Sequence, residues 1–361
     1  MPCPAVFPDA KGAFTFFLYT LLGTNHGILV ALSRKESGSF LYNPTTVVLV
    51  VECVKLVAAT ALYAKSSSVG ELVQEVVKHR KLGALYFVPA LLYCLFNNLS
   101  FINLANYDPT TYFVLLQLRV VMMGFVYQCL FRKRLTMMQW SSLVLLTIGC
   151  IIKEIGYQKW VKKDTSLHNG KDNEDKDDNK DGTLHPLLTP NIATAFLLMA
   201  VQGLCSCFAS VYNEYLLKGK ASTANQSAPL MVQNVFMYLN SILCNLLFLV
   251  FKGDFVSVFQ WKSIQSIGHP IVIGIIVNSA TTGLVTSVFL KSLNSILKSF
   301  ANAIEILLTT FVSYILFNSP LDLFTALAVL VVVCASFVYN LNPVKNEDLR
   351  RESGQKEEEE N

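Results

Sequence analysis

Charged residues are scarce in this sequence. Only 15% of its 361 residues are Asp, Glu, Lys or Arg, whereas soluble globular proteins carry about 25%. Hydrophobic residues make up 53% of the chain, and the mean hydropathy is +0.45. This composition excludes an ordinary soluble domain and indicates an integral membrane protein.

The cysteines form neither a disulfide framework nor a metal-binding pattern. Eight of the nine lie inside apolar stretches, where a thiol behaves as a small hydrophobic side chain. Cys205 and Cys207 are two residues apart, so on a helix they point to different faces. We therefore expect no disulfide, no metal site and no cofactor. Because the first residues lack a basic segment and a cleavage site, we expect the first apolar stretch to be retained as a span.

Apolar stretches long enough to cross a bilayer, about 17 to 25 residues each, recur along almost the whole chain. We identify ten of them: 13–33, 45–64, 83–104, 109–131, 137–156, 191–216, 229–251, 268–290, 294–317 and 321–341. The sequence thus predicts an all-α polytopic membrane protein with ten transmembrane helices.

The distribution of Lys and Arg between these spans predicts the orientation. Fifteen lie on the side that holds both termini, and four lie in the short loops of the other side. The connection between the fifth and sixth spans adds six lysines to the second side, but it is a long segment of mixed charge. By the positive-inside rule, which weights short loops, both termini are predicted to be cytosolic.

The charged connection divides the chain into two groups of five spans. We predict a first five-helix repeat at 1–158, a disordered charged linker at 159–188, a second repeat at 189–343 and a cytosolic tail at 344–361. Five is odd, so the second group must run with inverted orientation. Inverted repeats with a binding site near the bilayer midplane are a recurring plan of secondary transporters.

Four Lys and Arg residues fall inside the spans, where a charge at mid-helix costs about 2.5–3.5 kcal/mol on insertion scales. Lys153 is close enough to a span end to reach the interface. Lys55 follows Glu52 by three residues, so an internal ion pair is favoured over a ligand role for both. Arg119 and Lys298 need another explanation.

Arg119 and Lys298 occupy the fourth and ninth spans, which hold the same place in the two halves. If the halves pack as inverted repeats, both cations face one central cavity and can hold an anionic substrate. Arg suits phosphate because its planar fork donates two hydrogen bonds, while Lys acts as a point charge. The alternative is that Arg119 pairs with Glu305 or Glu52 and has only a structural role.

Polar side chains at mid-span extend the candidate site. Asn97 lies in the third span, Tyr112 lies two turns before Arg119, and Asn234 and Tyr238 share one face of the seventh span. Amides present donors and acceptors that suit a nucleobase, and phenols stack on rings or bond to phosphate. For each residue, hydrogen bonding between helices is the alternative role.

Several long motifs in order resemble the nucleotide-sugar transporters of the CMP-sialic acid, UDP-galactose and UDP-N-acetylglucosamine group. They are "NPTTVVLVVECVKL", "PALLYCLFNNLSFINLANYDPTTYFVLLQLRVV", "RKRLTMMQWSSLVLL", "VYNEYLLK", "VQNVFMYLNSI" and "SILKSFANAIE". The resemblance implies the drug/metabolite transporter fold with ten helices, cytosolic termini and residence in the Golgi membrane. By position, it assigns ligand contacts to Asn97, Tyr112, Asn234, Tyr238 and Lys298.

The fourth span departs from this family's pattern. Where sialic-acid-type members have "YQVTYQLK", this chain has "YFVLLQLR", so Arg119 replaces a phosphate-binding lysine and Leu116 replaces a tyrosine. The positive charge is kept, but the coordination of the phosphates must differ.

The function that we expect is import of UDP-galactose into the Golgi lumen in exchange for UMP, by alternating access and without enzymatic activity. UDP-N-acetylglucosamine or another nucleotide sugar is the alternative cargo, and a membrane-bound transferase or a non-transporting scaffold are alternatives of another class. Expected partners are the UDP-sugar, UMP and membrane lipids, with a homo-oligomer or Golgi glycosyltransferases as further candidates and no nucleic acid.

Overall fold

The computed structural model describes residues 10–33, 42–106, 112, 115–169, 192–219, 228–253, 258, 260–317 and 323–341. Within these residues the secondary structure is entirely helical. The elements are α1 (Ala10–Leu32), α2 (Pro44–Ala64), α3 (Val69–Lys78), α4 (Arg80–Leu85), α5 (Phe87–Asn106), α7 (Arg119–Phe131), α8 (Met137–Asn169), α9 (Ile192–Leu217), α10 (Leu230–Lys252), α12 (Trp261–Gln265), the 3₁₀ turn η1 (Ser266–Gly268), α13 (Pro270–Ser292), α14 (Ser295–Phe317) and α15 (Leu323–Leu341).

Six helical segments of the described chain are long and apolar enough to cross a membrane. They are Ala10–Leu32, Pro44–Ala64, Arg80–Ser100, Leu230–Lys252, Pro270–Ser292 and Ser295–Leu316. Each of them overlaps a predicted span, so the all-helical, multi-spanning class is confirmed. The number of ten spans stays a prediction.

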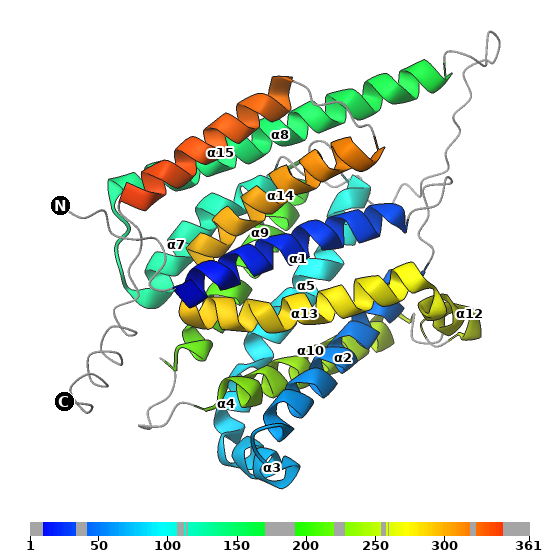
Figure 1. The fold of residues 1–361 in the computed structure, drawn as a ribbon, viewed down its shortest axis with the longest axis vertical. Coiled ribbons are helices and arrows are strands. Elements are labelled where there is room, and N and C mark those ends of the chain that lie inside the picture. The colour runs from blue at the N-terminus through cyan, green and yellow to red at the C-terminus, as the bar shows by residue number, and fades with distance from the viewer. Residues whose placement is uncertain are drawn as a thin grey trace.

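The helices lie side by side in one slanted bundle (Figure 1). At one edge, α15 packs along α8. In the middle, α1 packs against α13 and α14, while α9 packs against α5 and α7. At the other edge, α2 packs against α10 and α13, and α10 also contacts α5. The elements of the two sequence halves are therefore interleaved rather than separated.

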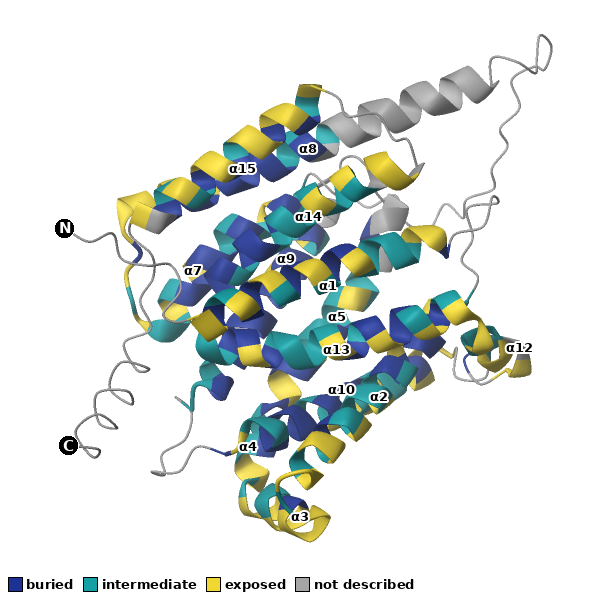
Figure 2. Ribbon diagram, viewed as in Figure 1, coloured by how far each residue is buried: buried dark blue, intermediate teal, exposed yellow. Residues whose placement is uncertain are grey.

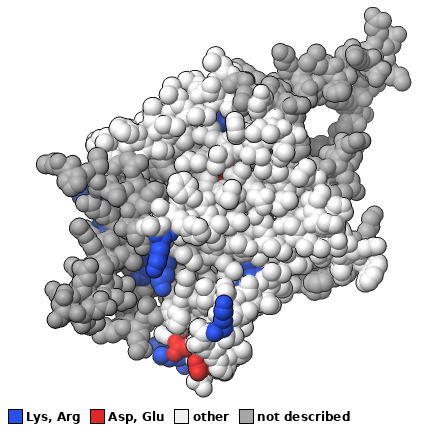
Figure 3. Space-filling model, viewed as in Figure 1, with Lys and Arg blue, Asp and Glu red and all other residues white. Residues whose placement is uncertain are grey.

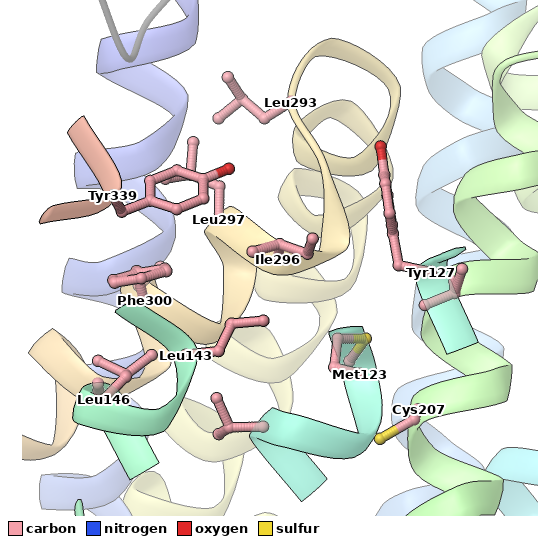
Figure 4. Packing of buried hydrophobic residues seen from close by; sticks show 14 of the residues in the cluster. Met123, Tyr127, Leu143, Leu146, Cys207, Leu293, Ile296, Leu297, Phe300 and Tyr339 are labelled. Carbon is pink, nitrogen blue, oxygen red and sulfur yellow. The ribbon is translucent and has the colours of Figure 1, made fainter. Parts of the chain in front are cut away.

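The largest buried apolar cluster joins α7, α8, α9, α14 and α15 (Figure 4). Leu143 and Leu146 of α8 meet Phe300 of α14 and Tyr339 of α15, and the rings of Phe300 and Tyr339 have centroids 4.7 Å apart. Since lipid tails are as apolar as leucine, such packing stabilises a membrane bundle mainly through van der Waals contact. The cluster holds the start of α14, where Lys298 lies, against α7.

The outer surface of the bundle is apolar and almost uncharged. Exposed residues lie along the outward edges of the helices (Figure 2), and on α1 they include the large apolar side chains of Phe14, Phe17 and Leu21. In the space-filling view most of the visible Lys, Arg, Asp and Glu side chains lie toward the left and lower edges of the described part, and a broad uncharged area covers much of the rest of this face (Figure 3). This is the surface that a lipid-embedded protein requires.

The structure differs from the sequence predictions at three places. The amphipathic helix α3, which was not predicted, lies between the second and third spans, where Ser68 caps its N-terminus. Helix α8 continues to Asn169, into the segment predicted as linker, because the lysines there are good helix formers. The helix of Arg119 is interrupted at Leu118 rather than continuous. Residues 170–191 and the tail 344–361 lie outside the described chain.

Candidate functional site

Arg119 lies at a break in the backbone of its span. Residues 115–117 are helical, and the amide of Leu118 then bonds to the carbonyl of Leu115 at 3.1 Å, a tighter turn than the α-helix makes. Helix α7 begins at Arg119, whose carbonyl accepts a hydrogen bond from the Cys207 thiol at 3.0 Å. At membrane depth, irregular backbone is tolerated where it is buried in protein or lines a cavity.

Two adjoining cavities lie between the helices around this break. The larger has a volume of about 260 Å³ and is lined by α2, α5, α9, α10, α13 and α14. The smaller has a volume of about 140 Å³ and is lined mainly by α1, α5, α7, α9 and α14. Tyr93 and Lys298 line both of them, so these two side chains mark where the cavities meet.

The larger cavity brings together four of the predicted ligand residues, Asn97, Asn234, Tyr238 and Lys298. The Asn234 amide donates to the Ser287 hydroxyl at 2.9 Å. The Tyr238 hydroxyl is buried and has no hydrogen-bond partner among the described residues. Because an unmade hydrogen bond of a buried hydroxyl costs about 1–3 kcal/mol, this group is poised for a partner inside the cavity.

The predicted ion pair in α2 is confirmed and lies on the wall of the same cavity. The Lys55 amine donates to Oε1 of Glu52, and it also lies 4.9 Å from the centre of the Tyr238 ring. Gly283 of α13 makes room for this lysine, since a side chain there would overlap the Lys55 methylenes. The second oxygen of Glu52 is buried and lacks a partner within the described chain, so the pair still offers one acceptor to a ligand.

The smaller cavity is lined by Arg119 and Lys298, together with Tyr19 and Asn302. The Tyr19 hydroxyl donates to the Asn302 side-chain oxygen at 2.9 Å, and the Lys298 amine lies 5.8 Å from the centre of the Tyr19 ring. Four serine hydroxyls complete this wall: Ser206, Ser210, Ser295 and Ser299. Two cations in one cavity suit a ligand with several negative oxygens.

Neither of these two cations is neutralised by a salt bridge. Within the described chain, no carboxylate oxygen lies within 4.0 Å of the Arg119 guanidinium or the Lys298 amine. Glu305 interacts with both only through the longer-range electrostatic field. Its carboxylate packs against Gly23 of α1, where any side chain would overlap it. The structure therefore does not show the alternative in which Arg119 forms an ion pair with Glu305 or Glu52.

Tyr112 lies away from both cavities. Its hydroxyl is 3.0 Å from the Gln202 side-chain nitrogen, which donates to it, and Gln202 in turn accepts from Asn103 at 2.6 Å. This buried network joins the chain before α7 to α5 and α9. In this structure Tyr112 takes part in hydrogen bonding between helices, and the other predicted ligand residues line the cavities. A ligand contact of Tyr112 stays a prediction.

Several lining residues escaped the sequence prediction. Tyr93 lies four residues before Asn97, and Asn302 lies four residues after Lys298, so each shares a helix face with a predicted ligand residue, whereas Tyr19 gave no such signal. The serines did carry a signal, because Ser206 and Ser210, like Ser295 and Ser299, are spaced four apart and so share a helix face.

Comparisons with known proteins identify a family and relatives of this chain. A family model described as nucleotide-sugar transporter matches residues 13–340. The chain is 42% identical over 360 residues to the UDP-galactose transporter senju of Drosophila melanogaster, and this alignment covers 94% of this chain and 89% of that protein. It is 27% identical over 335 residues to CMP-sialic acid transporter 1 of Oryza sativa subsp. japonica, with 90% and 93% covered.

Among solved structures, one crystal structure matches with a TM-score of 0.55 and 12% identity, over 92% of this chain and 97% of that one. At this identity the likeness concerns the fold alone. The family model, by contrast, spans nearly all of the chain, and a relative is 42% identical along it. The resemblance found in the motifs is confirmed: the chain belongs to the nucleotide-sugar transporter family, whose members are transporters and not enzymes.

Proposed function

We propose that this protein imports UDP-galactose into the Golgi lumen in exchange for UMP. The observation that carries the proposal is the pair of cations, Arg119 and Lys298, which line one cavity without a carboxylate partner in the described chain. The 42% identity to a protein named as a UDP-galactose transporter supports the choice of cargo over UDP-N-acetylglucosamine. The Golgi membrane is supported by family membership.

The diphosphate is placed between Arg119 and Lys298 in this proposal. A charge away from water is disfavoured unless it is paired and hydrogen-bonded, so each cation gains most from an anionic ligand. Arg119 can donate two parallel hydrogen bonds to one phosphate, and Lys298 adds a point charge at the junction of the cavities. Among the serines of the smaller cavity, Ser206 can add a donor, since Ser210, Ser295 and Ser299 already donate to protein oxygens in this structure.

The nucleoside and the hexose are then assigned to the larger cavity. Asn97 and Asn234 line it and can present amide donors and acceptors to a uracil edge. The free oxygen of Glu52 can accept from a sugar hydroxyl, and the Tyr238 hydroxyl can complete its missing hydrogen bond. The phosphate of UMP would bind the same cations. Binding of both nucleotides at one site is what an exchange cycle requires.

The contacts between helices support two inverted repeats and a ten-span bundle. We pair the helices of the two halves in order, α1, α2, α5, α7 and α8 with α9, α10, α13, α14 and α15. When each helix is replaced by its counterpart, the main contacts between the halves are found again. Thus α1 contacts α13 and α14, whereas α9 contacts α5 and α7. The contact of α2 with α13 matches that of α10 with α5. Rocking of one half against the other around the shared cavities is the corresponding mechanism.

An empty cavity would leave two facing cations unpaired, so reorientation without ligand is disfavoured. Because the affinity of a ligand for one state is what shifts a conformational equilibrium, a nucleotide that neutralises the cavity can allow the halves to move. Obligatory exchange of UDP-galactose for UMP follows from this electrostatic condition. The same condition argues against a scaffold, which would have no use for unpaired cations.

The orientation with both termini in the cytosol is supported by the exposed basic residues. The first residue of α1 and the last of α15 lie at the same end of the bundle, at the left in Figure 1. The connections at that end carry exposed basic side chains, namely Lys65, Lys78, Arg80, Lys81, Arg132 and Arg134. A cytosolic location of this end agrees with the positive-inside rule.

Uptake into proteoliposomes tests the function directly. Protein reconstituted into vesicles preloaded with UMP should accumulate radiolabelled UDP-galactose and return it chemically unchanged. Uptake of UDP-N-acetylglucosamine alone would transfer the assignment to the alternative cargo, and a glycosyl product without uptake would favour a transferase. No exchange with any nucleotide sugar would contradict the proposal.

The Arg119→Gln variant tests the site. Because Arg119 has no ion-pair partner among the described residues, this variant should unfold at the same temperature as wild type or higher, yet lose exchange. Arg134→Gln is the matched control, since Arg134 is an exposed cation beyond the end of α7. If Arg119→Gln unfolds the protein and Glu305→Gln restores it, Arg119 has a structural role instead.

A further inference from the structure

Helix α3 exposes an apolar stripe that no described residue covers. Val69, Val73 and Val77 are spaced four apart, so they form one line along the helix, and their exposed fractions are 53%, 56% and 60%. The adjacent edge of α3 is seated on the bundle through Leu72, which is buried in a cluster with Ala59 and Phe236. The helix is therefore held by one edge and presents its valines outward.

The chain on either side fixes α3 at the level where a membrane span ends. Four residues connect it to the last residue of α2, a length that reaches at most about 14 Å when extended. After α3 only His79 precedes α4, which opens the next membrane-crossing segment. The nearby surface of α2 is itself apolar, with Val57 and Leu62 exposed. The valine stripe thus continues the lipid-facing surface of the bundle.

Basic side chains surround the stripe. Lys65, Arg80 and Lys81 are exposed and form no ion pair with any described residue. Glu75 is occupied within α3, since it pairs with Lys78 at 2.8 Å and contacts His79 at 3.2 Å. This region shows the mixed blue and red side chains at the lower end of Figure 3. Glu71 in the first turn of α3 is also exposed and forms no ion pair with any described residue, so the unpaired charges beside the valines are three positive and one negative.

We propose that α3 is an interfacial helix that binds a membrane leaflet rich in anionic lipids. Its valine stripe lies at the level of the upper acyl chains, while Lys65, Arg80 and Lys81 contact headgroup phosphates. A short helix with an apolar face and flanking basic residues lies in the interface plane and is attracted by negative lipids. Both the apolar stripe and the unpaired cations therefore favour the surface of an anionic leaflet as the binding partner of α3.

Contact of α3 with the lipid surface also bears on the larger cavity. Helix α3 joins α2, which carries Glu52 and Lys55, to α4 and α5, which carries Asn97. Its Leu72 packs in the same cluster as Tyr238. Anchoring α3 to the lipid surface therefore fixes the end of two helices that form the larger cavity.

Fluorescence quenching of a tryptophan on the stripe tests the proposal independently of transport. Full-length protein with its three tryptophans replaced by phenylalanine and carrying Val73→Trp is reconstituted with lipids brominated on the acyl chains. We expect strong quenching, and much weaker quenching for the matched control Gln74→Trp, which lies on the exposed polar face. Equal quenching at the two positions, or none at Val73→Trp, would overturn the interfacial placement.

Hydrogen exchange of the unmodified protein tests the preference for anionic lipid and needs no variant. In nanodiscs of phosphatidylcholine with a third phosphatidylserine, the amides of 69–78 should exchange more slowly than in pure phosphatidylcholine. The substitution Arg80→Gln with Lys81→Gln should remove this difference. Exchange that is equal in both lipids would overturn the role of charge. Protection that rises with protein concentration would show that a second copy covers the stripe, and would overturn the lipid assignment.

Discussion

A buried ion pair at the end of α9 gives the sharpest stability prediction. Glu214 is fully buried, and the side chain of Lys218 is 8% exposed, with Oε1 and Nζ 2.6 Å apart. The other Glu214 oxygen accepts from the Ser295 amide at 2.7 Å, and Lys218 donates to the Leu293 carbonyl at 2.6 Å. The pair thus fastens α9 to the junction of α13 and α14, one turn before Lys298.

Removal of one charge of this pair should be costly. Glu214→Gln leaves the Lys218 ammonium buried against an amide, and Lys218→Met leaves the Glu214 carboxylate with only the Ser295 amide. Loss of one partner of a buried ion pair destabilises proteins by about 3–5 kcal/mol, whereas replacing both with neutral groups is often close to neutral. We expect each single variant to lose about that much, and the double variant to lose less than either.

Equilibrium unfolding in mixed micelles, followed by circular dichroism, measures this double-mutant cycle. A coupling between the two substitutions of about 3 kcal/mol or more is expected from the same magnitudes. Lys291→Met is a control, because Lys291 is a basic residue near the same helix junction and forms no ion pair in the described chain. Single variants as stable as wild type, or strictly additive losses, would refute the reasoning.

Two further substitutions test the walls of the cavities. Tyr238→Phe removes a buried hydroxyl that has no partner in the described chain, so it should not lower stability and can raise it. It should weaken UDP-galactose binding by roughly two- to tenfold, the contribution of about one hydrogen bond. Thermal unfolding and ligand titration of the purified protein measure the two effects. Gly23→Ala should place a methyl group against the Glu305 carboxylate and lower the unfolding temperature, and Gly268→Ala, where a side chain would meet open space, should not.

Local features of the site could be predicted from the sequence. The pair of Glu52 and Lys55 followed from a spacing of three residues on one helix, and geometry within a helix does not depend on the rest of the fold. The two cations were predicted to share a cavity from their corresponding places in the two halves, and both line the smaller cavity.

Features that depend on distant partners could not be predicted. Tyr112 accepts a hydrogen bond from Gln202, a residue 90 positions away. No local pattern in the sequence could therefore indicate that its side chain lies outside the cavities. Lys218 was counted as a loop residue because hydropathy falls at the end of α9, yet Glu214 and the Leu293 carbonyl bury it. Helix α3 was missed because ten residues with three charges are too short and polar for a search for spans.

The central claim is that Arg119 and Lys298 together hold the diphosphate, and ligand titration tests it most directly. Affinities of UDP-galactose and of uridine are measured for wild type, Arg119→Gln and Lys298→Gln, with Arg134→Gln as the control. Since a hydrogen bond to a charged group contributes about 1.5–3 kcal/mol, each cavity variant should bind UDP-galactose roughly ten- to a hundredfold more weakly, with uridine unchanged. Wild-type affinity for UDP-galactose in both cavity variants would contradict the account.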